Sequence, residues 1–131
     1  MLTAFFLICI HYIADFIFQS SKMALGKSKN IKDLLHHTFV YSSIWSIPII
    51  FLFPKDWSCD QYIYGSLLFC SITFIAHTIT DYFTSRIVHK SFANKMQDRS
   101  ILNFGPFSMI GFDQVLHYTQ LFLTFNYIIH L

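Results

Sequence analysis

The sequence contains no glutamate, and charged residues make up only 12% of its 131 positions. Hydrophobic residues account for 54% of the chain, and its mean hydropathy is +0.49. Both values are far from those of an average soluble domain, whose core does not require so much apolar surface. The composition therefore argues against an ordinary soluble protein, and the length leaves room for a single domain over residues 1–131.

Cysteine is scarce as well, and the three cysteines show no metal-binding spacing. Their odd number gives no complete disulfide framework, and two of the three fall inside apolar segments. We interpret Cys9, Cys59 and Cys70 as small apolar residues and expect no disulfide.

Lysine and arginine are missing from four long stretches of the chain. About 20 apolar residues cross the ~30 Å hydrocarbon layer of a bilayer, so each stretch is long enough for a transmembrane helix. The first stretch has no basic leader and carries Asp15 before any small-residue cleavage site, which favours a retained helix over a signal peptide. Short connections favour an all-α, integral membrane, up-down four-helix bundle. The predicted helices cover about residues 2–20, 34–53, 61–88 and 107–130.

The basic residues indicate how such a bundle would be oriented. Eight of the nine lie in two connections, whereas the second connection has only Lys55, against Asp56 and Asp60. The positive-inside rule places both basic loops in the cytoplasm and both termini outside. The eight basic residues are Lys22, Lys27, Lys29, Lys32, Arg86, Lys90, Lys95 and Arg99.

Carboxylates are rare inside the predicted spans, where three aspartates occur, each with a histidine four residues away. This spacing puts both members of a pair on one helix face. The first and third helices read His then Asp, and the antiparallel fourth reads Asp then His, so every aspartate lies nearer the cytoplasm. The similar first and third motifs also suggest two pseudo-repeated hairpins. The pairs are His11/Asp15, His77/Asp81 and Asp113/His117.

Buried aspartates in a bilayer need compensation, because each costs about 2.5–3.5 kcal/mol at a helix centre. One form is interhelical hydrogen bonding that only holds the bundle together. The other is a divalent cation held by imidazole nitrogens and carboxylate oxygens, with zinc expected first and manganese or iron as alternatives. Three pairs layered at one depth favour the cation. The predicted ligands are His11, Asp15, His37, His77, Asp81, Asp113 and His117.

The motifs along the chain resemble those of an uncharacterised domain-of-unknown-function family of small membrane proteins from bacteria and their phages. That family is more distantly similar to predicted membrane-bound metal-dependent hydrolases. The resemblance implies a bacterial inner-membrane location, adds Gln19, Lys27 and Arg86 as candidate substrate-binding residues, and prefers His37 to His36. The motifs are His11-x3-Asp15-Phe-x2-Gln19-x3-Met23-Ala-x2-Lys27-Ser28, His37-x3-Tyr41, His77-x3-Asp81-Tyr-x2-Ser85-Arg86 and Asp113-Gln114-x2-His117.

Three functions are compatible with these residues. The first is a metal-dependent hydrolase acting at the cytoplasmic face on a phosphate-bearing or lipid-linked substrate, with Asp81 or Asp113 as general base. Gln114 is a candidate for orienting water or substrate, and an interhelical hydrogen bond is its alternative role. The second function is a proton or metal-ion transporter, and the third is a non-catalytic, phage-encoded membrane partner protein. We expect membrane lipids as surroundings and no nucleic acid, and an oligomer is compatible with the sequence.

Overall fold

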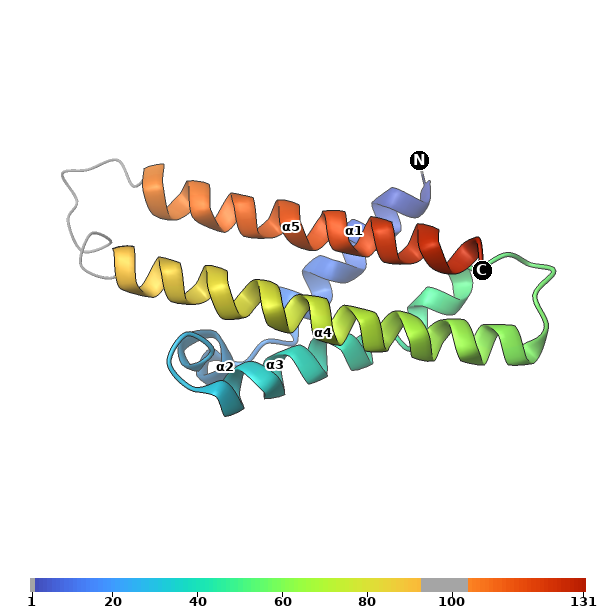
Figure 1. Cartoon of the computed structure of the whole chain (residues 1–131), viewed down its shortest axis with the longest axis horizontal. Helices are drawn as coiled ribbons and strands as arrows, with labels where there is room; N and C mark the ends of the chain where they lie inside the picture. The colour runs from blue at the N-terminus through green and yellow to red at the C-terminus, as the bar shows by residue number, and fades with distance from the viewer. Residues whose placement is uncertain (1, 93–103) are drawn as a thin grey trace.

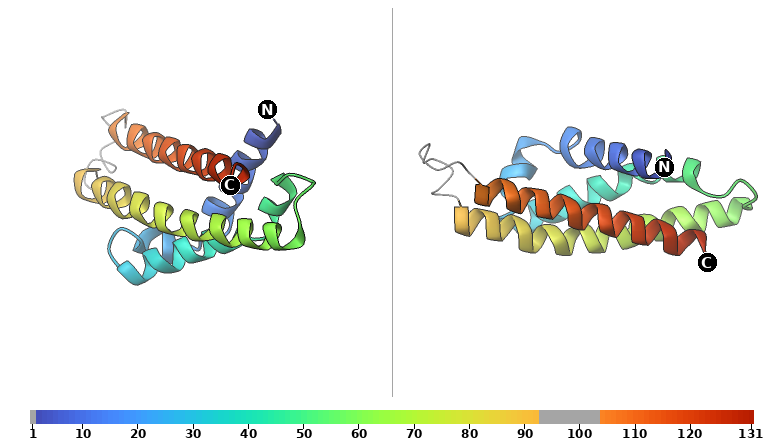
Figure 2. Two further views of the ribbon diagram at one scale, coloured as in Figure 1. Left: turned by 45° about the vertical axis from the view of Figure 1, so that its right-hand side comes forward. Right: turned by 90° about the horizontal axis from the view of Figure 1, so that it is seen from above.

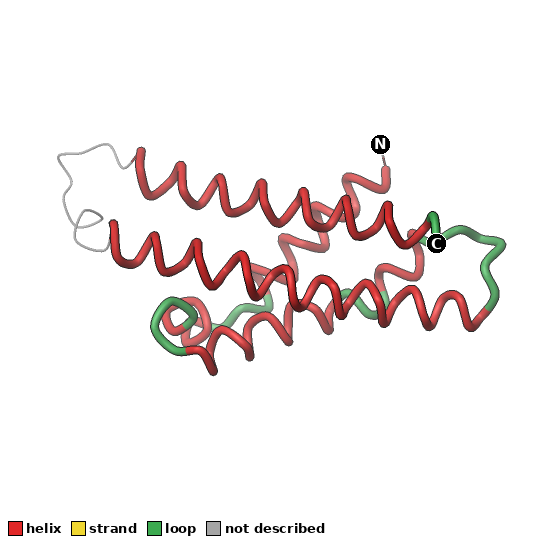
Figure 3. The backbone as a smooth tube through the Cα atoms, in the orientation of Figure 1, coloured by secondary structure: helices red, strands yellow, loops and turns green. Residues whose placement is uncertain are grey.

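The computed structural model describes residues 2–92 and 104–131, and every regular element in these ranges is helical (Figure 3). Lys95 and Arg99, on which the predicted topology partly depends, lie outside the described residues. The elements are α1 (Leu2–Tyr12), the π-helix η1 (Ile13–Ile17), α2 (Ser21–Gly26), α3 (Ile31–Ile44), the 3-10 helix η2 (Pro48–Leu52), α4 (Cys59–Phe92) and α5 (Phe104–Ile129).

The two long helices α4 and α5 form the frame of the molecule. They contain 34 and 26 residues, which correspond to about 51 and 39 Å at 1.5 Å per residue. They run antiparallel and pack closely along their length, while α1 crosses α5 and α3 packs on α4 (Figures 1 and 2). Both chain termini lie at one end of this frame, and α2 lies toward the other.

The first predicted helix, over 2–20, is neither uniform nor as long as expected. An α-helix covers Leu2–Tyr12, a π-turn follows over Ile13–Ile17, and the backbone N–H of Phe18 closes that turn on the carbonyl of Ile13 at 3.1 Å. The wider turn carries Asp15 on its buried side, where only 3% of the residue is exposed. Single π-turns of this kind are frequent at functional sites.

The predicted loop over 21–33 contains a short helix of its own. The side chain of Ser20 caps α2 by accepting from the N–H of Met23 at 3.3 Å, and Met23 is buried. The chain then turns tightly after Gly26, and Asn30 caps α3. A Cβ atom at Gly26 would overlap the side chain of Asp33, so this turn requires glycine.

The second predicted helix, over 34–53, is interrupted before Pro48. Proline has no N–H to donate to the carbonyl of Ile44, and its ring clashes with that carbonyl, so α3 ends at Ile44. The chain resumes as η2, with Pro48 in its first turn. The first hairpin is therefore built from short, broken helices and the second from two long ones, which differs from a simple repeat of equal hairpins.

An apolar core fills the half of the bundle that holds the termini. Trp45 and Phe69 are fully buried there with ring centroids 5.3 Å apart, and Phe53 stacks on Phe125 at 6.3 Å. The remaining buried apolar residues of this core are Leu7, Ala14, Tyr41, Ile49, Leu121 and Ile128.

The outer surface is also apolar, although the histidines and aspartates are buried. Large side chains such as Phe39, Phe51 and Leu67 are 63%, 71% and 64% exposed. Among the described residues, one helix is long and apolar enough to cross a membrane, over Cys59–Lys90, and Leu2–Ile17 forms a shorter apolar helix. The described part of the chain therefore has an apolar core in one half, a buried polar cluster in the other and many exposed apolar side chains.

Candidate metal centre

Most of the predicted metal ligands meet in one buried cluster between η1, α3, α4 and α5. His37, His77 and Asp81 are at most 1% exposed, and Asp15 is 3% exposed. His117 is fully buried, whereas Asp113 is half-buried at the edge of the cluster. The neighbouring His36 is exposed. Of the two adjacent histidines, His37 is therefore the one that belongs to the cluster.

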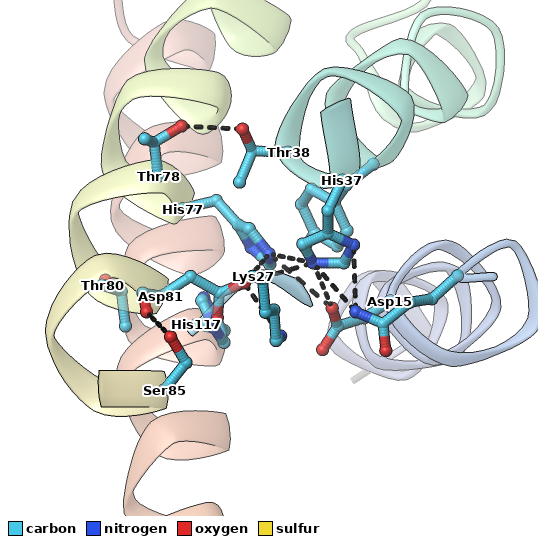
Figure 4. A network of polar contacts seen from close by, with 12 residues as sticks. Asp15, Lys27, His37, Thr38, His77, Thr78, Thr80, Asp81, Ser85 and His117 are labelled. Carbon is cyan, nitrogen blue, oxygen red and sulfur yellow. Dashed lines mark hydrogen bonds and ion pairs between the residues drawn. The ribbon is translucent and has the colours of Figure 1, made fainter. Parts of the chain in front are cut away.

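A hydrogen bond between α3 and α4 sets two of the histidines opposite each other. The hydroxyl of Thr78 donates to that of Thr38 at 2.8 Å, and the residue before each threonine is a histidine (Figure 4). The Nε2 atoms of His37 and His77 consequently lie only 3.2 Å apart. Two imidazole nitrogens therefore point at the same small volume.

Two carboxylate oxygens border the same volume (Figure 4). Asp15 Oδ1 lies 3.1 Å from His37 Nε2 and 3.6 Å from His77 Nε2. Asp81 Oδ2 lies 3.2 Å from His37 Nε2 and 3.5 Å from His77 Nε2. Each oxygen thus forms a triangle with the two nitrogens.

These triangles have the size expected for one face of a tetrahedral metal site. Zinc binds imidazole nitrogen and carboxylate oxygen at about 2.0–2.1 Å, which makes the edge of such a tetrahedron about 3.3–3.4 Å. The edges around His37 and His77 measure 3.1–3.6 Å. The donor set of His, His and Asp also suits a catalytic site that keeps a position for water. The residues therefore fit a bound transition metal.

His117 and Asp113 extend the cluster beyond Asp81. His117 Nε2 lies 3.4 Å from Asp81 Oδ1 and 3.4 Å from Asp113 Oδ1. The ring of His117 stacks on that of His77, with centroids 4.1 Å apart, and Tyr41 stacks on the other face of His77 at 3.9 Å. Three nearly parallel rings therefore hold the orientation of these histidines.

His11 differs from the other predicted ligands because protein groups occupy both of its nitrogens. Its Nδ1 contacts the hydroxyl of Tyr41 at 2.7 Å, and its Nε2 contacts the side-chain oxygen of Gln114 at 2.8 Å. The amide nitrogen of Gln114 in turn lies 3.3 Å from Asp113 Oδ2 and 3.5 Å from Asp15 Oδ2. The structure thus places His11 behind the cluster, where it positions Gln114 between two carboxylates.

Gln19 has a similar supporting position at His37. Its side-chain nitrogen lies 3.1 Å from His37 Nδ1 and donates to it in this arrangement. An imidazole that binds metal through Nε2 carries its proton on Nδ1 and donates it to an acceptor. With a metal bound at His37 Nε2, the amide of Gln19 would have to turn over so that its oxygen accepts from Nδ1.

A cavity of about 410 Å³ opens beside the carboxylates. Asp15, Asp81 and Asp113 line it, whereas His11, His37, His77 and His117 do not, so the aspartates lie between the histidines and the opening. This order agrees with the predicted polarity of the three pairs. Gln19, Lys27 and Gln114 also line the cavity.

Lys27 reaches the cluster from the turn after α2. Its Nζ lies 2.9 Å from Asp81 Oδ2. Burial by itself lowers the pKa of Lys27, but the carboxylates of Asp81 and Asp15 outweigh that effect and raise the pKa above its usual value. The ammonium group therefore stays charged at the mouth of the site.

The structure places Arg86 differently from the prediction. Its guanidinium lies over the ring of Tyr82 at 3.9 Å and donates to the carbonyl of that residue, and it is not among the described residues that line the cavity. The reason is geometric, because Arg86 lies five residues beyond Asp81 on α4 and points away from the face that carries Asp81.

Sequence reasoning missed one residue of the site. The hydroxyl of Thr84 donates to Asp113 Oδ1 at 2.5 Å and so fixes this carboxylate from α4. Thr84 lies three residues after Asp81, on the same helix face, and this spacing was the available signal.

Of three comparisons with known proteins, the one with protein families gives a match. No curated protein and no solved structure matches the chain. A family described as "Protein of unknown function (DUF3307)" matches residues 2–131, a range that includes every residue of the cluster. This match confirms the resemblance to an uncharacterised family that the motifs indicated. The chain therefore belongs to the DUF3307 family of proteins of unknown function.

Proposed function

We propose that this protein is a membrane-embedded, metal-dependent hydrolase that removes a phosphate group from a lipid-linked substrate at the cytoplasmic face. The observation that carries the proposal is that His37 Nε2 and His77 Nε2 lie 3.2 Å apart and that one oxygen of Asp15 and one of Asp81 each lie 3.1–3.6 Å from both nitrogens, beside a cavity. Mutual hydrogen bonding alone is a poorer explanation, because the Nε2 atoms of His37 and His77 face each other at 3.2 Å, and both lie against the same two carboxylate oxygens.

The membrane location is supported by the many exposed apolar side chains of a molecule that keeps its histidine and aspartate cluster buried. The α4 helix is long enough to cross the ~30 Å hydrocarbon layer with residues to spare, and α5 has a similar length. The other two crossings are the broken passages α1 with η1 and α3 with η2. Such breaks are tolerated in a membrane where they are buried in protein or line a cavity. The distribution of basic residues then places the cavity mouth and Lys27 in the cytoplasm.

In this proposal His37, His77 and Asp15 hold the metal, with Asp81 beside them. The bound metal supplies a Lewis acid and lowers the pKa of its water toward ~7. Asp113, fixed by Thr84 and Gln114, takes one proton from the attacking water as the water oxygen forms a bond to phosphorus. The same proton passes to the alcohol oxygen when the old P–O bond breaks, so that the products are an alcohol and phosphate.

The cavity walls suggest the substrate class. Lys27 and Lys29 are among the residues that line the cavity and favour an anionic group, whereas Phe16, Leu25 and Ile110 add apolar surface to its lining. A volume of about 410 Å³ lies within the usual range for small-molecule sites. A phosphate group attached to an alkyl chain matches both kinds of lining residue, which a free sugar phosphate does not.

Transport is the less well supported alternative. A path for ions would have to continue through the half of the bundle that contains Leu7, Trp45, Phe69 and Leu121, all at most 1% exposed. Polar side chains in that half, such as Thr73 and Gln120, bond to each other and form no chain of titratable groups. The third alternative, a non-catalytic partner protein, predicts that the cellular role survives loss of the metal ligands.

The test uses detergent-purified protein loaded with Zn²⁺, Mn²⁺ or Fe²⁺ and then freed of excess metal. We expect the wild type and His36→Ala to retain metal and to hydrolyse long-chain alkyl phosphates. His37→Ala and His77→Ala should lose both properties. His36 is the matched control, because it is a histidine one position away with an exposed side chain. A wild type that retains none of the three metals would overturn the proposal.

A further inference from the structure

We infer that the site holds two metal ions, with the carboxylate of Asp81 bridging them. The inference rests on the proposed metal centre and deepens it by adding a second position, formed by Asp81 Oδ1, Asp113 and His117. The first position remains that of Asp15, His37 and His77.

The two oxygens of Asp81 face two different groups of ligands. Oδ2 lies 3.2 Å from His37 Nε2 and 3.5 Å from His77 Nε2. Oδ1 lies 3.4 Å from His117 Nε2 on the neighbouring helix α5. A carboxylate that uses each oxygen toward a separate set of donors has the arrangement of a bridging ligand.

His117 provides the independent observation for the second position. Its side chain is fully buried, and within the described part of the chain its Nδ1 has no hydrogen-bond partner. Its Nε2 faces two carboxylates without a well-directed hydrogen bond to either, and a cation held between these groups would neutralise the buried carboxylates. The Nε2 atom lies 3.4 Å from one oxygen of Asp81 and 3.4 Å from one oxygen of Asp113, which matches the ~3.3 Å edge of a metal site.

The spacing of the two positions agrees with known two-metal chemistry. The rings of His77 and His117 are nearly parallel, at 22°, with centroids 4.1 Å apart. One ligand atom from each of His77, Asp81 and His117 lies within 4.8 Å of the others, which leaves room for two neighbouring ions. Metal ions in two-metal hydrolases of phosphate esters lie about 3.5–4 Å apart and stabilise the attacking and leaving oxygens together.

In the two-metal arrangement Asp113 is a ligand of the second ion, which replaces the general-base role that the single-metal proposal gives it. One of its oxygens accepts from Thr84 at 2.5 Å, and the other accepts from Gln114 at 3.3 Å. A carboxylate held on both sides keeps a fixed lone pair toward the neighbouring His117. The second metal would therefore lie at the cavity side of the cluster, where Asp113 lines the opening.

The test is the metal stoichiometry of the full-length protein in detergent, loaded with Mn²⁺ and freed of excess metal. We expect two equivalents of Mn²⁺ per chain and an exchange-coupled electron paramagnetic resonance spectrum. His117→Ala should retain one equivalent with the six-line spectrum of isolated Mn²⁺. Asp113→Asn provides a second variant of the same position that preserves side-chain volume, in case His117→Ala does not fold.

The outcomes separate the two proposals. A wild type with one equivalent, unchanged in His117→Ala and Asp113→Asn, overturns the two-metal inference and leaves the single-metal centre standing. A wild type with no retained metal overturns the centre itself. His36→Ala is the matched control, because His36 is a histidine with an exposed side chain next to His37 and outside the cluster, and it should retain two equivalents.

Discussion

Replacing Asp81 by asparagine would separate the structural role of this carboxylate from its role in metal binding. The side chain is 1% exposed and pairs with Lys27, whose side chain is 17% exposed, at 2.9 Å. Asparagine keeps the volume but leaves the ammonium group without its nearest counter-charge. Removing one partner of a buried ion pair costs about 3–5 kcal/mol. Because Lys27 is partly exposed and Asp15 also supports it, we expect about 3 kcal/mol, roughly a 100-fold change in the unfolding equilibrium.

Combining Asp81→Asn with a second substitution, Lys27→Met, should restore most of the lost free energy of unfolding. The double variant contains no unpaired buried ammonium, so its free energy of unfolding should lie within about 1 kcal/mol of the wild type. Metal retention should not follow the stability of these variants. Lys27→Met alone should keep its metal because no ligand is lost, whereas both variants that contain Asp81→Asn should lose it.

The assay is denaturation by dodecyl sulfate in mixed micelles, followed by the fluorescence of Trp45 and Trp57. A chelator in all samples removes any contribution of bound metal to stability. Metal content is measured separately by elemental analysis after loading. If Asp81→Asn proves as stable as the wild type and retains its metal, the reasoning about both the ion pair and the ligand is refuted.

Three further predictions concern packing, hydrogen bonding and topology. Gly65→Ala should cost about 1–3 kcal/mol, because a Cβ there meets an aromatic ring at 2.8 Å, while Gly111→Ala meets nothing within 4 Å and should stabilise α5 by about 0.5–1 kcal/mol. Thermal unfolding in detergent compares the two, and equal shifts would contradict the packing. Tyr41→Phe removes a buried 2.7 Å hydrogen bond and should cost about 1–3 kcal/mol with metal content unchanged, so loss of metal would contradict its supporting role. A membrane-impermeant thiol reagent applied from outside should label Cys59 and miss Lys22→Cys, and the reverse result would invert the topology.

Much of the site could be predicted from spacing alone. A histidine and an aspartate four residues apart share a helix face, and the antiparallel order of the pairs placed the aspartates on one side. The cavity is indeed lined by Asp15, Asp81 and Asp113. All-helical architecture and family membership also followed from the sequence, because both depend on patterns that run along most of the chain.

The sequence could not show which side chains contact which. His11 and His77 have the same spacing to an aspartate, yet His77 faces the ligand cluster and His11 bonds to Tyr41 and Gln114. The difference arises from the π-turn that begins at Ile13, which changes the direction of Asp15 and has no known sequence signature. The sequence also could not show which basic side chain contacts the site, because Lys27 reaches Asp81 only through the tight turn after α2.

That π-turn also has a consequence for how this chain can vary in length. A π-turn contains one more residue than the α-turn it replaces, so the segment Ile13–Ile17 behaves as a one-residue insertion. Deleting a single residue from it would convert the π-turn into an ordinary α-turn. The segments on either side could keep their directions, while the wider turn that carries Asp15 on its buried side would be lost. The number of residues between His11 and Gln19 is thus a specification of the site.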